Sequence, residues 1–239
     1  MTLLRAIDFE TSAFEPRNEG DPKPEICEVG WTDLTLNPTV PNADVGKTVS
    51  ELCLPGDGVI TAEASSVHHI VAADVLDRPS FDEIRPRLFD GSPSYFIAHG
   101  ADFERGLFDG GETPWIDTYK IALRIWPDAP AHKLQVLRYH LDLPRGRDVG
   151  AAHRAGPDSL LCALLMQRII ATDKFSLADM VRFSNGPALL PRMTIGQHRG
   201  KKWEDVPTSF LEWIVGKGDD IGRDLVANAK FHLNKRAGA

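Results

Sequence analysis

The sequence has few cysteines, and they are far apart. Only three occur in 239 residues, Cys27, Cys53 and Cys162, and none has the spacing of a zinc site. An odd number of distant cysteines excludes a disulfide framework as the basis of the fold and favours a reducing compartment. We therefore expect a cytoplasmic protein whose cysteines take no part in its chemistry.

Long apolar runs are also absent. The most apolar helix candidate, residues 159–171, contains Gln167 and Arg168 and is too short to span a bilayer. The first residues lead directly into a strand-like segment and do not have the basic and apolar regions of a signal peptide. We therefore expect a soluble protein with no membrane partner.

An excess of positive charge is missing as well. The net charge is −7, which at first argues against a nucleic-acid partner. The charge is uneven, however, because residues 174–239 hold 11 Lys and Arg against 7 Asp and Glu, whereas the remainder holds 16 against 27. Such a division suits a body that holds cations and a tail that contacts phosphates, although ordinary scatter also gives such a balance.

The sequence does contain a run of strands followed by strand–helix units. Hydrophobic alternation and β-prone composition predict strands at residues 3–10, within 25–36, and at 49–54, 94–98 and 115–118, with a loop at 37–46. Helical spacing predicts helices at residues 61–70, 81–89, 101–108, 119–125, 134–140 and 157–171. A second unit follows residue 171, with a hairpin at 193–203 and helices at 210–214 and 222–233. This order predicts an antiparallel meander within a mixed sheet flanked by helices, an α/β fold.

Two acids at the end of the first predicted strand form the first candidate site. Side chains alternate along a strand, so Asp8 and Glu10 project from one face while Ile7 and Phe9 project from the other. Two close carboxylates in a sheet are costly to bury unless a cation neutralises them, and Mg²⁺ or Mn²⁺ prefers such oxygen ligands. A solvated strand end with two acids is the simpler interpretation of this segment alone.

A second candidate precedes the longest predicted helix. Pro157 suits the first helical position, which places Asp158 in the first turn, where the helix dipole favours a carboxylate. His153 lies on the loop just before it and could act as a general base near neutral pH. A capping acid beside an exposed histidine is the alternative.

A third group of acids follows the predicted strand at 94–98. Asp102 and Glu104 lie just after His99 and Gly100, at the end of a buried strand where α/β folds commonly place functional groups. An ordinary helix start enriched in acids would have the same composition.

Taken in order, these three segments resemble the motifs of the DEDD exonuclease superfamily, in the branch that has His in the last motif. The segment with Val67, His68 and His69 is similar to the part of the family that lies over the terminal nucleotides of the substrate. Asp117-Thr118 followed by Ala122-Leu123-Arg124 is also similar to a family segment. The resemblance covers roughly residues 3–171 and implies an RNase H-like, mixed five-stranded sheet in an exonuclease domain at residues 1–172.

The resemblance implies a 3′→5′ exonuclease that uses two divalent cations, Mg²⁺ or Mn²⁺. Asp8 would bridge the cations, Glu10 and Asp158 would bind the one that activates water, and Glu104 would support the other. His153 would accept the proton of that water. Thr11 is a weaker candidate for contacting the terminal nucleotide through its backbone.

The tail resembles the small C-terminal module of the exodeoxyribonuclease X group. The similarity rests on residues 193–201, Val206 and 211–213, and it implies an α+β module at residues 173–239. Arg199, Lys201 and Lys202 are its candidates for binding DNA phosphates.

Two positions depart from the family pattern. The register of the family assigns the acid of the second motif to Glu104, where Asp is common, and Asp102 is the alternative. On a helix starting near residue 101, Phe103 and Leu107 are expected to share a core-facing stripe, with Glu104 at the rim of the cleft. The other departure is His69, at a position where Gly is usual.

The resemblance favours DNA, as a single strand or a 3′ end, as the partner, and DNA repair as the context. An RNA-directed 3′→5′ exoribonuclease of the same superfamily is the nearest alternative, because the catalytic residues do not separate the two. A non-catalytic nucleic-acid-binding protein that kept the fold is a further alternative, favoured only by the altered second motif.

Overall fold

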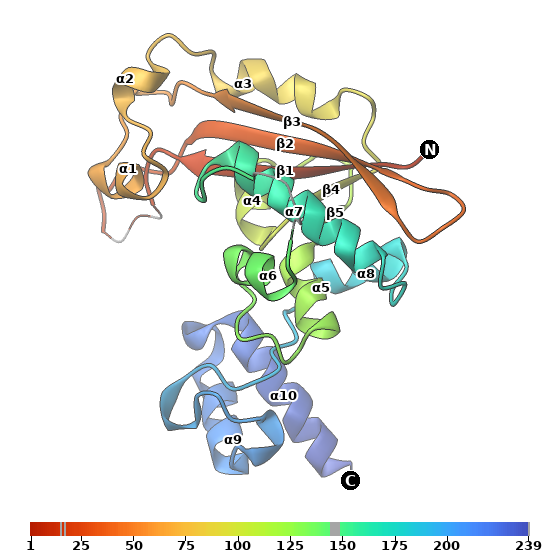
Figure 1. Cartoon of the computed structure of the whole chain (residues 1–239). Coiled ribbons are helices and arrows are strands. Elements are labelled where there is room, and N and C mark those ends of the chain that lie inside the picture. Colours follow the sequence, from red (N-terminus) through yellow and green to blue (C-terminus); the bar gives the residue numbers. More distant parts are fainter. Residues whose placement is uncertain (15, 17, 144–148, 239) are drawn as a thin grey trace.

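A five-stranded sheet forms the centre of the larger part of the chain (Figure 1). The computed structural model describes residues 1–14, 16, 18–143 and 149–238. The strands, which lie side by side in the order β3-β2-β1-β4-β5, are β1 (Leu3–Thr11), β2 (Ile26–Leu36), β3 (Ala43–Leu52), β4 (Tyr95–Ala98) and β5 (Trp115–Asp117).

The sheet is mixed, as the sequence predicts. β2 pairs antiparallel with both β1 and β3, which confirms the meander, and β4 pairs parallel with β1 and β5. The third strand begins earlier than predicted, at Ala43, within the segment expected to be a loop, and it ends at Leu52. Thr35 pairs with Asp44 and Ala43 is fully buried, so pairing with β2 overrides the weak strand propensity of this segment.

Helices cover both faces of the sheet, and each face has its own apolar cluster. Leu4 and Ala6 of β1 face the cluster formed with α5, α6, α7 and α8, whereas Ile7 and Phe9 face the one that includes Ile84, Leu88 and Phe108. The helices of this part are α1 (Ala62–His68), α2 (Ala72–Val75), α3 (Phe81–Ile84), η1 (Arg85–Phe89), α4 (Asp102–Leu107), α5 (Thr118–Ile125), α6 (Leu134–His140), α7 (Ala155–Ile170) and α8 (Leu177–Asn185). The even-numbered positions of β1 therefore point toward α7.

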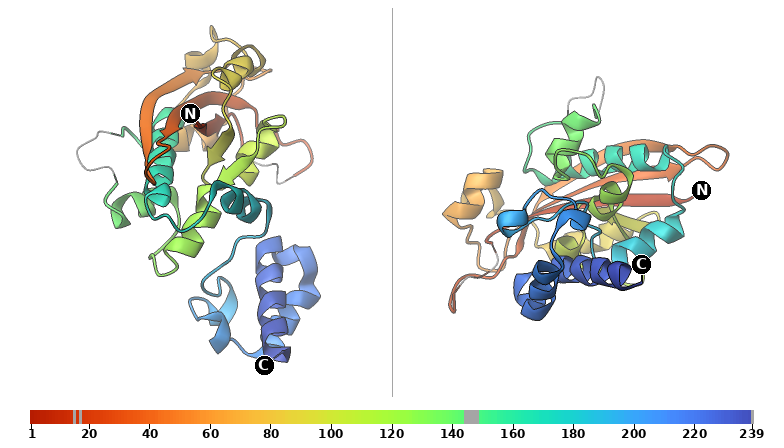
Figure 2. Two further views of the ribbon diagram at one scale, coloured as in Figure 1. Left: turned by 90° about the vertical axis from the view of Figure 1, so that its right-hand side faces the viewer. Right: turned by 90° about the horizontal axis from the view of Figure 1, so that it is seen from below.

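The C-terminal residues form a separate apolar cluster below α5 and α6 (Figures 1 and 2). Trp203, Leu211 and Leu225 lie at its centre. Its elements are η2 (Gly196–His198), η3 (Trp203–Asp205), α9 (Thr208–Lys217), η4 (Gly218–Ile221) and α10 (Arg223–Ala237). Of the hairpin expected at 193–203, the structure has the antiparallel closure, one bridge between Arg192 and Lys202, but short helical turns stand where its strands are expected.

Helix α8 was not predicted from the sequence. Ser176 caps it by accepting a hydrogen bond from the backbone N–H of Asp179 at 3.1 Å. Met180 and Phe183 of α8 pack into the cluster of the sheet, not into that of the C-terminal residues. Within the described part of the chain, every helix is too short or too polar to span a bilayer.

Candidate active site

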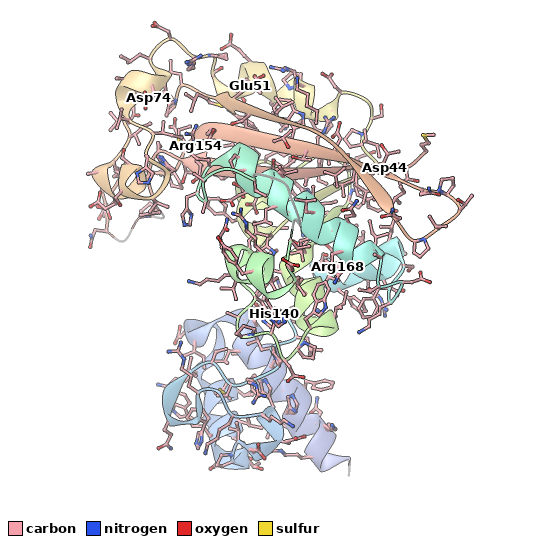
Figure 3. The ribbon with its side chains drawn as sticks, viewed as in Figure 1. Asp44, Glu51, Asp74, His140, Arg154 and Arg168 are labelled. Carbon is pink, nitrogen blue, oxygen red and sulfur yellow. The ribbon has the colours of Figure 1, made fainter. Side chains whose placement is uncertain are left out.

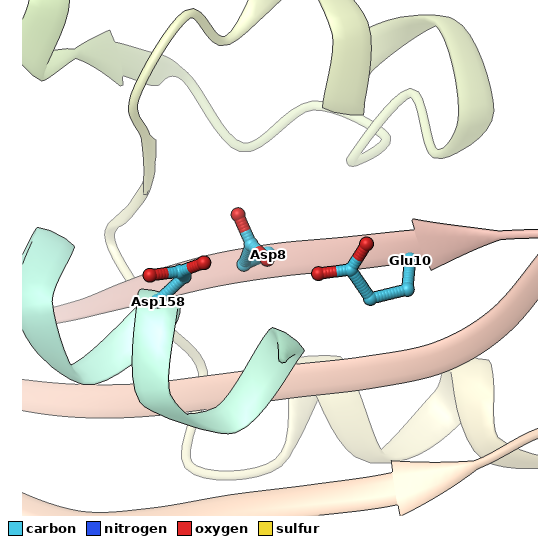
Figure 4. Close-up of side chains that lie close together, drawn as sticks. All are labelled: Asp8, Glu10 and Asp158. Carbon is cyan, nitrogen blue, oxygen red and sulfur yellow. The ribbon is translucent and has the colours of Figure 1, made fainter. Parts of the chain in front are cut away.

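Three carboxylates from α7 and the C-terminal half of β1, the central strand of the sheet, face one small space (Figure 4). Asp8 and Glu10 share a face of β1 because the side-chain period of a strand is two. Asp158 approaches from the first turn of α7, and one oxygen of each carboxylate lies within 4.8 Å of the others. The structure thus brings together residues that are 150 positions apart in the sequence.

Mutual repulsion and loss of solvent raise the pKa values of these groups in the cation-free protein. Desolvation is the main cause of the raised pKa of Asp8, followed by the charges of Glu104, Glu10 and Asp158. Burial, with the charges of Asp158 and Glu28, raises the pKa of Glu10 to about 8. The site therefore stabilises positive charge, whether as protons or as bound cations.

Of the two acids of the second motif, Glu104 is buried near this group, where its charge acts on Asp8, and Asp102 points to solvent. Glu104 is only 5% exposed, and its Oε2 has no hydrogen-bond partner among the described residues. Burial first, then the charge of Asp117, raises the pKa of Glu104 to about 8. The side chain of Asp102 is 65% exposed and binds the Nζ of Lys120 at 3.0 Å. A buried carboxylate oxygen without a partner is the feature expected of a cation ligand.

The expected orientation of this helix is wrong in one respect. Phe103 is 43% exposed and does not join a core-facing stripe, although Leu107 packs against the cluster beneath it. Helix α4 is short, and the residue that it buries is Glu104. Glu104 is therefore buried where the sequence predicts that Phe103 is buried.

Hydrogen bonds hold Asp158 on both sides. Its Oδ2 accepts from the backbone N–H of His153 at 2.8 Å, and its Oδ1 accepts from Nε2 of Gln135 on α6 at 2.8 Å. Helix α7 begins at Ala155, two residues before the predicted start at Pro157, so Asp158 still lies in the first turn. His153 is exposed and has a left-handed backbone, with φ 59°.

The other predicted contacts to the terminal nucleotide cluster where β1 ends. Thr11 is buried, and its carbonyl accepts a hydrogen bond from Nε2 of His68 at 3.1 Å, while Nδ1 of His68 accepts from the N–H of Ile70. Val67 is half-buried. His69 is exposed and is the C-cap of α1 with φ 63°, a conformation that Gly adopts without strain.

The three predicted cations of the tail are exposed and close in sequence. Arg199, Lys201 and Lys202 flank a turn in which the N–H of Met193 donates to the carbonyl of Lys201 at 2.9 Å and the N–H of Gly200 donates to that of Met193. Nζ of Lys202 also lies 3.9 Å from Oε1 of Glu204. All three lie in the C-terminal part of the chain and are not members of the carboxylate group.

Several residues that shape the site carry no local signal in the sequence. Gln135 reaches Asp158 across 23 residues, and Glu28 reaches Arg154 across 126. Glu28 could have been identified only from the register, because it lies opposite Glu10 on the neighbouring strand. Lys120 binds Asp102 outside the site. It lies in a segment that resembles the family, but the resemblance rests on the neighbouring residues.

The donors fit a divalent cation. Asp8, Glu10 and Asp158 offer hard oxygen atoms that face one another, and Glu104 adds a buried oxygen without a partner among the described residues. None of the ion pairs in the described ranges of the chain involves Asp8, Glu10 or Glu104. A mixed sheet carrying such a carboxylate set has the donor groups of a cation-dependent nuclease.

The chain belongs to the exonuclease family RNase_T, whose model matches residues 6–166. It is similar to exodeoxyribonuclease 10 of Escherichia coli K12, with 26% identity over 237 residues that cover 97% of this chain and 99% of that protein. It is also similar to the DNA polymerase III subunit epsilon of Treponema pallidum, with 25% identity over 77% of this chain and 84% of that one. The expectation of a 3′→5′ exonuclease is thereby confirmed.

Solved structures share the fold. A structure of exonuclease X in complex with 5′ overhanging duplex DNA matches 76% of this chain and 99% of its own, with a TM-score of 0.64 and 24% identity. A 3′-exonuclease recognising a histone mRNA stem-loop matches 71% of this chain and 64% of its own, with a TM-score of 0.56 and 17% identity. The RNase H-like mixed sheet expected from the sequence is confirmed by these neighbours.

Substitutions in α4 test which acid serves the site. Glu104→Gln should remove most exonuclease activity, because an amide of the same size cannot ionise to neutralise a bound cation. Glu104→Asp should retain part of the activity, and Asp102→Asn should cost little beyond the ion pair with Lys120. Release of nucleotides from an end-labelled strand measures all three, and full activity of Glu104→Gln would exclude it from the site.

The raised pKa values predict how stability depends on pH. Glu10 and Glu104 have an ordinary pKa of 4.5 but a pKa of about 8 in the folded, cation-free protein. Between these values the folded state binds more protons than the unfolded chain, so the free energy of unfolding falls as the pH rises. Tm measured in EDTA should therefore decrease from pH 5.5 to pH 8, less steeply in Glu104→Gln. An equal slope in the two proteins would contradict the prediction.

Proposed function

We propose that this exonuclease acts on DNA. It would hydrolyse phosphodiester bonds at 3′ ends, release nucleoside 5′-monophosphates and depend on two divalent cations, Mg²⁺ or Mn²⁺. The convergence of Asp8, Glu10 and Asp158, with the buried carboxylate of Glu104 nearby, is the observation that carries the proposal. A role in DNA repair and a cytoplasmic location stay predictions.

Each acid has a role that follows from its position. Asp8, Glu10, Asp158 and Glu104 would hold the cations, with Asp8 between the others. When bound, the cations supply an activated water and neutralise charge on the attacking and leaving oxygens. His153, exposed next to Asp158, would accept the proton of the attacking water.

The hydrogen bonds of Asp158 support these proposed roles. Its oxygens accept hydrogen bonds from His153 and Gln135, so the carboxylate cannot rotate away from Asp8 without losing both. Thr11, fixed through its carbonyl by His68, would present its backbone to the terminal nucleotide. Val67, His68 and His69 would lie over that nucleotide.

Similarity over the whole length favours DNA over RNA. The sequence match to exodeoxyribonuclease 10 covers 97% of this chain, including the C-terminal residues, and among the solved structures the complex with DNA matches with a TM-score of 0.64 against 0.56 for the 3′-exonuclease that recognises a histone mRNA stem-loop. RNA stays the alternative substrate, since both kinds of enzyme share the sheet. A binding protein without catalysis is disfavoured by the complete set of acids.

The C-terminal residues would form a module that holds the trailing strand. The predicted division between residues 172 and 173 stays a prediction, and the packing of α8 on the sheet favours a boundary after Asn185. Arg199, Lys201 and Lys202 would contact phosphates there, since all three are exposed.

Digestion of matched, end-labelled DNA and RNA oligonucleotides tests the function. We expect DNA to lose nucleotides from its 3′ end with Mg²⁺ or Mn²⁺ and not with EDTA. Asp8→Ala and Asp158→Ala should each abolish release, while Asp44→Ala, an exposed acid of β3 away from the site (Figure 3), should not. Faster digestion of RNA would overturn the choice of substrate, and turnover by Asp8→Ala would overturn the cation site.

Substitution of the tail cations tests the module. Replacing Arg199, Lys201 and Lys202 together by Ala should weaken the binding of a long single strand. The slope of log affinity against log salt should become shallower by roughly 0.7 for each phosphate that the variant no longer neutralises. Hydrolysis of a dinucleotide should hardly change, because it is too short to reach the module, and equal reductions on both substrates would argue against this role.

A further inference from the structure

The start of α7 lies unusually close to the sheet. A Cβ atom at Gly30 of β2 would overlap the backbone of Ala155 and Gly156, and a Cβ at Gly156 would lie 2.7 Å from that of Ser50 on β3. Backbone therefore packs on backbone at this point, which leaves the first turn of α7 little freedom to shift.

One buried carboxylate ties this turn to β2. Glu28 is 1% exposed, and its oxygens accept from Nε and Nη2 of Arg154 at 2.9 and 2.8 Å, from the N–H of Ala155 at 3.1 Å and from Ser50 Oγ at 2.7 Å. Figure 3 shows Arg154 at the start of α7, beside the sheet. Although burial acts to raise it, these hydrogen bonds hold the pKa of Glu28 below its ordinary value.

The residue held next to this pair is His153. Its φ of 59° is unfavourable for a residue with a Cβ, and such a conformation persists only where the neighbouring contacts fix it. Asp158 fixes the N–H of His153 on one side, and Glu28 fixes Arg154 and Ala155 on the other. The strained residue thus lies between two anchors.

The geometry points to Glu28 and Arg154 as a positioning pair that holds His153 in place for proton transfer. This inference rests on the proposed role of His153 as the base. Glu28 is not a fifth cation ligand, although it lies opposite Glu10, because each of its oxygens already accepts two hydrogen bonds, whereas each oxygen of Asp158 accepts one. Arg154 also lowers the cost of the charge on Glu10.

Kinetics on an end-labelled single strand at saturating Mg²⁺ test the pair. Glu28→Gln and Arg154→Ala should each lower kcat by roughly 10–100-fold, the usual effect of removing a supporting group of a site, with little change in KM. Arg154→Lys should recover only part of the rate, because an ammonium group cannot donate two parallel hydrogen bonds to a carboxylate. Ser50→Ala, which removes one hydrogen bond and keeps the Cβ beside Gly156, should show a smaller reduction.

A double-mutant comparison separates positioning from a general loss of stability. If Glu28 acts through His153, Glu28→Gln should add little to the reduction caused by His153→Ala. Asp33→Asn is the matched control, because it breaks the Arg5–Asp33 pair on the same sheet, at 2.7 Å, away from the site. It should lower Tm without changing kcat.

The outcomes are distinct. Unchanged kcat in Glu28→Gln and Ser50→Ala, or reductions that multiply with that of His153→Ala, would overturn the positioning role and leave the exonuclease assignment intact. Full activity of His153→Ala would instead overturn the proposed base, and with it the basis of this inference.

Discussion

Repulsion among four carboxylates is the constraint on which the rest of the site depends. Asp8, Glu10, Glu104 and Asp158 come from three elements that the sheet brings together, and each has a raised pKa in the cation-free protein. Folding alone gains nothing from such an arrangement, because burial and like charges both oppose ionisation. The arrangement becomes favourable only when positive charge is supplied, so the scaffold is destabilised at the place where it can bind cations.

Neighbouring acids are separated from this set by their own cations. Glu28 is paired with Arg154, and Asp102 with Lys120, at 2.8 and 3.0 Å. Asp117, also buried, accepts hydrogen bonds through Oδ1 from the backbone N–H groups of Gly100, Tyr119 and Lys120, and its Oδ2 lies 3.9 Å from Nζ of Lys120. Each of these carboxylates therefore has a local charge or dipole partner, which keeps it from competing for the ions. The difference between a structural acid and a ligand lies in these partners and not in the residue type.

The sequence was most informative where function depends on local periodicity. The alternation of β1 places Asp8 and Glu10 on one face, and α6 has the predicted bounds. Prediction from the sequence failed where contacts between distant residues determine the structure. Pairing with β2 extends β3 through a polar segment, and α4 buries Glu104 where the sequence predicts Phe103. Gln135 and Glu28 act through partners 23 and 126 residues away, and no local pattern can indicate such contacts.

The fold by itself does not decide the substrate, because solved structures that share it include one with duplex DNA and one with an RNA stem-loop. We propose that discrimination lies in the segment around His68, which fixes the end of β1, and in the C-terminal residues with their exposed cations. These C-terminal residues have an apolar core of their own and an excess of basic residues, in contrast to the acidic body. The carboxylate group and the exposed C-terminal cations thus lie in parts of the chain with opposite net charge, so these basic groups do not neutralise the carboxylates.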